Sequence, residues 1–264
     1  MVATITACRA TEPQQGDRMV DIGGCRLHML VKGRGLPVVV LESGTGDTIS
    51  SWAKVQPEVA KFTCVAAYDR AGLGLSDPAV TEPRATAQIA RELHTALHKA
   101  HLAPPYVLVG HSMGGFHVRL FAQQFPKEVA GMVLVDPSAE DWNELLKVQF
   151  PDEYEKMMAW RNGDHPAGMK KELAAWDISK EQARAARALP DVPVVLFTGL
   201  LGNPGGTQIV RRLHSEWLQT IPHGTHIETV KSGHYLHVNE PELVVNAISN
   251  MVAGARSITA KKRK

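Results

Sequence analysis

The chain has 264 residues, of which 44% are hydrophobic and 21% charged, a composition typical of a globular protein with a sizeable core. A formal net charge of +2 gives no electrostatic reason to expect a nucleic-acid partner, and no apolar stretch approaches the roughly 18 residues of a membrane span. The three cysteines, Cys8, Cys25 and Cys64, are far apart, so neither a disulfide framework nor a cysteine zinc site is indicated.

The two ends of the chain bear on its location. Residues Ile5-Thr6-Ala7-Cys8 weakly resemble the end of a lipoprotein signal, but the charged start and apolar stretch of a signal peptide are missing. We therefore expect a cytoplasmic protein as the sequence is written, and a secreted or lipoprotein-derived one if an export segment was removed. The basic run at 261–264 is expected to be a solvated tail. No feature of the sequence indicates an oligomeric state.

Strands and helices are predicted to alternate along the chain. Strands are expected at 19–22 and 26–31 around the Gly23-Gly24 turn, and then at 37–41, 62–68, 106–109, 129–135, 194–197 and 226–230. Helices are expected at 52–60, 86–101, 113–125, 208–219 and 241–253. Apolar strands that alternate with amphipathic helices predict an α/β fold, in which helices cover both faces of a mostly parallel central sheet.

One segment departs from this alternation. Between Pro137 and Pro190 no strand is predicted, and helical pieces are expected at 142–148, 152–160 and 168–188, with a break near Asp177. We predict that 137–190 form a helical cap over a core made of 18–136 and 191–254, with flexible termini at 1–17 and 255–264. The large apolar side chains of this segment are Trp142, Met157, Met158, Trp160, Met169 and Trp176. We expect some of them to face the site, which favours a substrate with an apolar portion.

The most informative motif is Gly110-His111-Ser112-Met113-Gly114, a G-x-S-x-G sequence. It follows the predicted strand at 106–109 and opens the predicted helix, which is the strand–turn–helix setting that this motif requires. The glycines leave room for a sharp turn with the serine at positive φ. The motif therefore predicts that Ser112 is a nucleophile presented at the carboxyl edge of the sheet.

A nucleophilic serine needs a base, and the base needs a group that orients it. His234 follows the glycine after the last predicted strand, so its ring can reach back across the sheet edge to Ser112. His223, His226 and His237 are alternatives nearby. His226 is expected at the wrong edge of the sheet, and His237 lies one turn further on, where a structural hydrogen bond is expected.

Four segments together resemble the α/β-hydrolase superfamily of serine esterases and lipases over roughly 20–253. The segments are Glu42-Ser43-Gly44-Thr45-Gly46, Tyr68-Asp69-Arg70-Ala71-Gly72-Leu73-Gly74-Leu75-Ser76, Gly110-His111-Ser112-Met113-Gly114-Gly115 and Ser232-Gly233-His234. The resemblance implies an α/β-hydrolase fold and an oxyanion hole made by the backbone N–H groups of Thr45 and Met113. Ser43-Gly44 stands where the superfamily usually has His-Gly, which still allows backbone donation.

The third member of the site departs from the usual pattern, because residues 199–206 contain no carboxylate after the strand that normally carries the acid. Asp136 ends the preceding strand, where haloalkane dehalogenases, one branch of the superfamily, place their acid. Asp136 is therefore the candidate acid. An Asp136 that only caps the turn before Pro137, with Asn203 or Asp141 as the orienting group, is the alternative.

The sequence thus predicts a serine hydrolase in which Ser112, His234 and Asp136 cleave a small-molecule carboxylic ester through an acyl-enzyme. Hydrolysis of a lactone, amide, thioester or carbon–carbon bond, or cofactor-free perhydrolysis, at the same site stays open, as does a ligand receptor without activity. Haloalkane dehalogenation is disfavoured, because it needs a carboxylate nucleophile where Ser112 stands.

No metal or cofactor is expected. His94, His98 and His101 share a helix face at i, i+4 and i+7, but no carboxylate on that face completes a metal site. Gly72-x-Gly74 lacks the third glycine and the opening helix of a dinucleotide fingerprint, so it is predicted to be turn chemistry.

Overall fold

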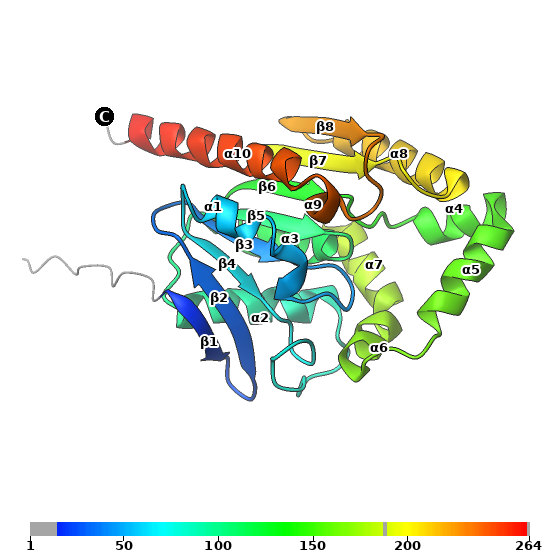
Figure 1. The fold of residues 1–264 in the computed structure, drawn as a ribbon, viewed down its shortest axis with the longest axis horizontal. Coiled ribbons are helices and arrows are strands. Elements are labelled where there is room, and N and C mark those ends of the chain that lie inside the picture. Colours follow the sequence, from blue (N-terminus) through cyan, green and yellow to red (C-terminus); the bar gives the residue numbers. More distant parts are fainter. Residues whose placement is uncertain (1–14, 187–188, 263–264) are drawn as a thin grey trace, which may run out of the picture.

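The computed structural model describes residues 15–186 and 189–262, and its core is a sheet with the strand order β1-β2-β4-β3-β5-β6-β7-β8 (Figure 1). The strands are β1 (Gly16–Asp21), β2 (Arg26–Lys32), β3 (Val38–Glu42), β4 (Val65–Tyr68), β5 (Tyr106–His111), β6 (Val129–Val135), β7 (Val194–Gly199) and β8 (Gly224–Thr229). The segment at Cys8 lies outside the described residues.

The sheet is parallel from β4 to β8, and β2 runs antiparallel to both of its neighbours. The predicted opening hairpin is confirmed by the pairing of β1 with β2. Because the parallel strands run in one direction, their carboxyl ends, including those of β3, β4, β5, β6 and β7, lie at one edge of the sheet. Proteins with such sheets bind their ligands at this edge.

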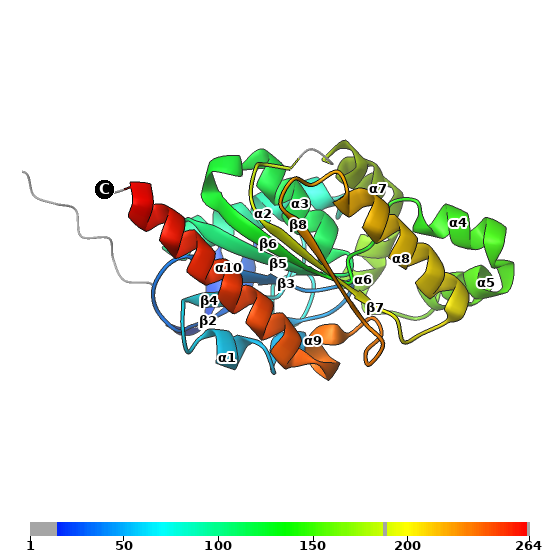
Figure 2. The same cartoon turned by 90° about the horizontal axis from the view of Figure 1, so that it is seen from above.

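Helices cover both faces of the sheet, as Figures 1 and 2 show. They are η1 (Ile49–Trp52), α1 (Gln56–Val59), α2 (Thr86–Lys99), α3 (Gly114–Gln124), η2 (Pro126–Glu128), α4 (Trp142–Gln149), α5 (Pro151–Arg161), α6 (Ala167–Ala174), α7 (Trp176–Ala185), α8 (Pro204–Leu218), α9 (Leu236–Asn239) and α10 (Pro241–Lys262). Apolar side chains of α2, α3 and α8 belong to one core layer, and those of α1 and α10 belong to the other.

The alternation of side chains along the strands explains why these strands are apolar throughout. Val38 and Val40 of β3 point into the layer that holds α2 and α3, whereas Val39 and Leu41 point into the layer that holds α1 and α10. All four are fully buried. Period-two alternation puts neighbouring residues on opposite faces, so a sheet covered on both sides needs apolar residues at every position.

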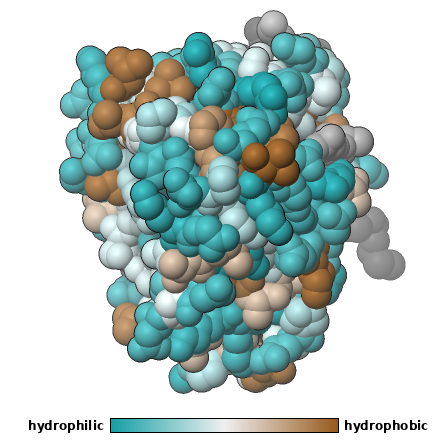
Figure 3. All heavy atoms as spheres, turned by 90° about the vertical axis from the view of Figure 1, so that its right-hand side faces the viewer, coloured by the Kyte–Doolittle hydropathy of each residue, from teal (hydrophilic) through white to brown (hydrophobic). Residues whose placement is uncertain are grey.

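Four helices, α4 to α7, lie between β6 and β7 in the chain. Helix α7 contacts α2 and α3, and α4 contacts α8, so the segment is tied to the sheet-covering helices at both of its ends. The side of the molecule that these helices form is mostly hydrophilic, with hydrophobic residues in several separate patches (Figure 3). Exposed apolar side chains of this segment include Val148 and Trp160.

Helix α8 begins earlier than predicted, at Pro204 instead of Gln208, although Gly205 and Gly206 disfavour helix. Both glycine N–H groups donate to the carboxylate of Glu153, at 3.2 and 2.9 Å. A Cβ at Gly205 would lie only 2.4 Å from the ring of Phe150. Because a carboxylate from another helix caps this end and an aromatic ring packs against it, tertiary contacts override the local preference.

The closing helix was predicted too short, because α10 continues past Gly254 to Lys262. Gly254 lies in open space, and a glycine in an exposed helix costs only about 1 kcal/mol. Arg256 offsets this cost by donating to the carbonyls of Leu36 and Phe62, both at 2.8 Å.

The predicted helix at 52–60 is also wrong as one element, because it is divided into η1 and α1. In the described residues, every helix is too short or too polar to span a bilayer.

Candidate active site

Ser112 lies at the sharp turn between β5 and α3, with a positive φ of 52°. The flanking glycines are required by close packing. A Cβ at Gly110 would lie 2.7 Å from the carbonyl oxygen of Gly114, and a Cβ at Gly114 would lie 2.7 Å from the carbonyl oxygen of Glu42. Since such distances are too short for real Cβ contacts, only glycine at both positions allows this turn. The half-buried Ser112 hydroxyl is held at the carboxyl edge of the sheet.

The three side chains singled out from the sequence lie in one hydrogen-bonded chain. His234 Nε2 lies 2.9 Å from Ser112 Oγ, and His234 Nδ1 lies 2.7 Å from Asp136 Oδ2. The His234 side chain is 46% exposed, whereas that of Asp136 is 8% exposed. The imidazole can therefore be reached by solvent and substrate, while the carboxylate behind it is shielded.

Asp136 is held by backbone contacts at the end of β6. Its Oδ1 accepts a hydrogen bond from the backbone N–H of Gly199 at 3.0 Å, and its φ is 43°. His214, from α8, donates to the carbonyl of Pro137 at 2.7 Å and supports the same turn. Burial alone would raise the pKa of the Asp136 carboxyl, but the hydrogen bond and the charge of His234 outweigh it, and the pKa is lowered. The carboxyl is therefore an ionised acceptor for His234 Nδ1–H.

His111, the variable residue of the G-x-S-x-G motif, contributes to the site in a way that the sequence analysis missed. Its Nε2 donates to the carbonyl of His234 at 3.0 Å, and the two rings lie 4.7 Å apart. Burial lowers the pKa of His111 to about 3, so the ring is neutral and keeps the N–H that it donates. In the sequence, the only signal for this role was the position of His111, at the end of a strand and directly before Ser112.

The other histidines near the end of the chain do not contact Ser112. His223 is exposed, and His226 lies within β8 with its Nε2 at 2.7 Å from Thr198 Oγ1. The expected structural hydrogen bond of His237 is wrong. Within the described part of the chain its ring nitrogens have no hydrogen-bond partner, and the ring packs at 4.5 Å from Trp52 instead.

The alternative acids also lie elsewhere. Asn203 precedes the first residue of α8 and is exposed. Asp141 precedes α4 and forms an ion pair with Arg184 at 2.6 Å. Of the three candidates, Asp136 is the one whose carboxylate contacts the His234 ring.

The two backbone N–H groups expected to form an oxyanion hole belong to neighbouring loops. The hydroxyl of Thr45 donates to the sulfur of Met113 at 3.3 Å, which ties the loop after β3 to the turn after β5. Among the described residues, neither the Thr45 N–H nor the Met113 N–H donates a hydrogen bond. Both donors are therefore available to a group bound beside Ser112.

Arg70 organises the loop that carries Thr45. The residue is 2% exposed, and its guanidinium donates to the carbonyls of Ser43 at 2.7 Å and Gly44 at 2.6 Å. It also donates to Glu42 at 2.7 Å and makes a bidentate pair with Glu172 of α6, at 2.6 and 2.9 Å. One buried cation thus joins the loop, the end of β3 and a helix of the 137–190 segment. The sequence analysis quoted Arg70 within a motif but assigned it no role.

Helix α6 packs directly on the loops of the site. A Cβ at Gly46 would lie 2.4 Å from the sulfur of Met169, and a Cβ at Gly168 would lie 2.1 Å from the carbonyl oxygen of Gly72. The second approach is one backbone against another and has glycine on both sides, whereas the first is against a flexible side chain. Met169 is therefore one apolar side chain of the segment that lies beside the loop after β3, whereas Trp160 is exposed.

Gly72 and Gly74 shape the turn that follows Arg70. Their φ values are 87° and 51°. Asp69 accepts hydrogen bonds from the backbone N–H groups of Ile49 at 2.8 Å and Leu75 at 3.0 Å, and a Cβ at Gly74 would lie 2.1 Å from its carboxylate. The glycines therefore serve a tight turn around a buried carboxylate, which positions Arg70 next to it.

A family model of the alpha/beta hydrolase fold matches residues 37–175, which is more than half of the chain. The chain belongs to the alpha/beta hydrolase fold family. The predicted α/β-hydrolase fold and the resemblance stated from the sequence motifs are both confirmed.

Relatives of this alpha/beta hydrolase chain extend over nearly its whole length. The protein YqjL of Bacillus subtilis is 29% identical over 245 residues, which cover 90% of this chain and 93% of that protein. A haloalkane dehalogenase variant from Bradyrhizobium elkanii superposes with a TM-score of 0.74 and 18% identity, covering 94% of this chain and 99% of that one. A thermophilic esterase from Thermogutta terrifontis superposes with a TM-score of 0.63 and 20% identity, covering 90% and 98%. At such identities the structural likeness shows the fold alone.

Proposed function

We propose that this alpha/beta hydrolase is a serine hydrolase that cleaves carboxylic esters through an acyl-enzyme. The observation that carries the proposal is the continuous hydrogen-bonded chain from Ser112 Oγ through His234 to Asp136, with distances of 2.9 and 2.7 Å. A nucleophile, a base and an orienting acid in that order are the groups that acyl transfer requires.

The reaction follows from these contacts. Ser112 Oγ attacks the ester carbonyl carbon while His234 Nε2 takes the hydroxyl proton. The negative charge that develops on the carbonyl oxygen is met by the N–H groups of Thr45 and Met113, each typically worth about 10²–10³ in rate. His234 then returns the proton to the leaving alkoxide. Water then attacks the acyl carbon while His234 takes one of its protons. The bond between the acyl carbon and Ser112 Oγ breaks, His234 returns the proton to Oγ, and the carboxylic acid leaves, while Asp136 keeps the Nδ1–H orientation.

We further propose that 137–190 act as a cap and that 18–136 and 191–254 form the core. The support is the contact of α6 with the loop after β3, through Met169 and through the Glu172–Arg70 pair. The ring centroids of Trp176 in α7 and Phe116 in α3 are 5.9 Å apart, and Phe116 is four residues after Ser112 in the chain. Apolar side chains of this segment thus lie beside the loop after β3 and beside the start of α3, which favours an ester with an apolar portion. Dehalogenation is not proposed, because Ser112 stands where that chemistry needs a carboxylate.

A fluorophosphonate probe and a panel of p-nitrophenyl esters of short and long acyl chains test this function. We expect stoichiometric labelling that Ser112→Ala abolishes and Ser257→Ala, on the exposed face of α10, leaves intact. Ester turnover should also be lost in Ser112→Ala. Turnover of lactones, amides or thioesters without ester turnover would change the assigned bond, and ligand binding with neither labelling nor turnover would replace the enzyme by a receptor.

The rate of ester cleavage should fall as pH is lowered, because a protonated His234 cannot accept the Ser112 proton. Protonation of Asp136 should not cause a second fall in kcat/KM at low pH within this range, since its pKa is held below the ordinary value despite the opposing effect of burial. Burial also lowers the pKa of His111 to about 3 and that of His237 to about 2, so neither ring becomes charged above about pH 4. Values of kcat/KM measured from about pH 4 to 9 check this. A rate that stays constant down to about pH 4 would contradict a histidine base.

A further inference from the structure

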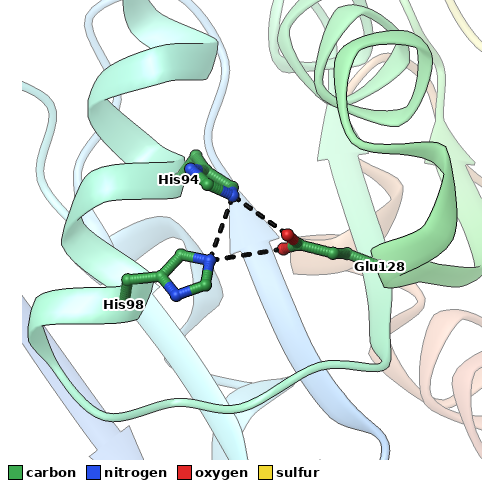
Figure 4. Close-up of side chains that lie close together, drawn as sticks. All are labelled: His94, His98 and Glu128. Atoms are coloured by element: carbon green, nitrogen blue, oxygen red, sulfur yellow. Dashed lines mark hydrogen bonds and ion pairs between the residues drawn. The ribbon is translucent and has the colours of Figure 1, made fainter.

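A second group of chemistry-bearing side chains lies on α2, outside the site described above. His94 and His98 are one helical turn apart, and Glu128 of η2 faces both of them across the gap between the two elements (Figure 4). The sequence analysis expected no carboxylate on this helix face to complete a metal site, and the carboxylate that faces the two histidines comes from a different element. His101 does not belong to the group.

The three side chains converge on one point. His94 Nε2 lies 3.1 Å from Glu128 Oε1 and 3.0 Å from His98 Nε2, and His98 Nε2 lies 3.5 Å from Glu128 Oε2. Zinc binds imidazole nitrogen and carboxylate oxygen at about 2.0–2.2 Å, so two ligand atoms of a tetrahedral site are about 3.3 Å apart. The three observed separations bracket that value, although the two that involve Glu128 go to different oxygens of its carboxylate. Either oxygen can therefore turn toward an ion that both imidazole nitrogens face.

Hydrogen bonds alone do not satisfy these contacts. A neutral imidazole has one N–H, and His94 Nε2 faces both a carboxylate oxygen and a second imidazole nitrogen. If that nitrogen donates to Glu128, it cannot accept from His98 and can only share its one N–H between the two. Two rings that are both protonated at Nε2 would bring N–H groups together at 3.0 Å. Glu128 Oε2 is buried and has no hydrogen-bond partner within the described part of the chain. A cation at the centre would accept a lone pair from all three residues.

The site is held in place before any ion arrives. The His94 ring stacks on Phe125 with a centroid distance of 3.6 Å and an interplanar angle of 6°. The backbone N–H of Glu128 donates to the carbonyl of Phe125 at 3.0 Å, so the same residue fixes a ring and the turn that carries the carboxylate. The side chains of His94 and Glu128 are 23% exposed and that of His98 is 50% exposed, which leaves a path for an ion.

We propose that His94, His98 and Glu128 bind a divalent transition-metal ion, with Zn²⁺ as the ion that their two-nitrogen, one-oxygen donor set suits. Mg²⁺ and Ca²⁺ are disfavoured, because these ions prefer oxygen ligands throughout. Glu128 immediately precedes β6 and Asp136 immediately follows it, and a strand of seven residues spans about 20 Å. The metal therefore lies at the edge of the sheet opposite Ser112 and clamps α2 to the connection between α3 and β6.

Isothermal titration of the chelator-treated full chain with ZnCl₂ tests the proposal. We expect one Zn²⁺ per chain, and at least a tenfold weaker Kd in both His98→Gln and Glu128→Gln. Excess Zn²⁺ should raise the Tm of the wild type by about 5 °C and leave that of the His94→Gln/His98→Gln double variant unchanged. MgCl₂ should give no saturable binding.

His223→Gln is the matched control, because His223 is an exposed histidine that also lies beside a carboxylate, that of Asp191 at 3.3 Å. Its Zn²⁺ affinity should equal that of the wild type. Ester turnover should be unchanged in His98→Gln, so the metal site and the hydrolase function are tested separately. Binding that is absent in the wild type, or that Glu128→Gln leaves intact, would overturn the site in favour of a proton-bridged His–Glu cluster.

Discussion

Asp136→Asn is expected to lower kcat for ester cleavage by about 10³–10⁴-fold while the fold stays intact. The asparagine oxygen can still accept the hydrogen bond from the Gly199 N–H, which holds the turn. Its NH₂ group then faces His234 Nδ1 and makes that nitrogen an acceptor. The ring proton moves to Nε2, the atom that faces Ser112, and the base is lost. Steady-state kinetics, with far-UV circular dichroism and Tm for the fold, measure both parts of the expectation.

The matched control for this prediction is Asp141→Asn, which removes the charge of the alternative acid at the start of α4. Its ion pair with Arg184 is half exposed, so the loss should cost little stability. We expect kcat within a few-fold of the wild type. If Asp141→Asn were the inactive variant and Asp136→Asn turned over ester normally, the acid would have to be reassigned.

Arg70→Gln is expected to destabilise the protein by about 3–5 kcal/mol and also to lower kcat. The substitution leaves the buried carboxylates of Glu42 and Glu172 without their cation, and two carbonyls of the loop after β3 lose their donor. Because Thr45 lies in that loop, its N–H should no longer be held toward the developing oxyanion. Urea unfolding measures the first effect. Initial rates at a temperature where the variant is fully folded measure the second.

Arg84→Gln separates the two effects. Arg84 is also buried, at 1% exposed, and makes a bidentate pair with Glu92 of α2, at 2.6 and 2.8 Å. Among the described residues its hydrogen bonds go to Glu92 and not to a loop of the site. It should destabilise the protein without changing kcat of the folded enzyme. Glu172→Gln, which keeps the shape of the contact and removes its charge, should lower kcat more than it changes KM. If folded Arg70→Gln had the kcat of the wild type, Arg70 would have no role in positioning the loop that carries Thr45.

Much of the fold could be predicted from local patterns. The strand at 129–135 was predicted with the bounds that the structure has, and the turn at Ser112 follows from the glycines two residues before and after it. Helix ends were predicted less well. The start of α8 depends on Glu153, and the continuation of α10 depends on Arg256, and both contacts join residues far apart in the chain.

The site divides in the same way. Ser112 and His234 were predicted because each has a glycine within two residues and lies just after a strand. The roles of Arg70 and Glu172 were missed, since an arginine or a glutamate has no local mark that distinguishes a positioning contact from a surface one. The role of His111 was missed although its position next to Ser112 was a signal. Glu128 was missed because the search for a carboxylate followed a single helix face, and the residue that faces His94 comes from another element.

By itself, then, the sequence determined where most strands and helices lie, although not all of their ends, and which serine and histidine are the candidate nucleophile and base. These features depend on side-chain period and on the backbone freedom of nearby glycines, which act over a few residues. Only the tertiary structure decided that Asp136 contacts His234, that Arg70 donates hydrogen bonds to the loop after β3, and that Glu128 lies beside two histidines. Those contacts depend on the order of strands in the sheet and on the packing of helices across it, and neither is encoded in any short stretch of chain.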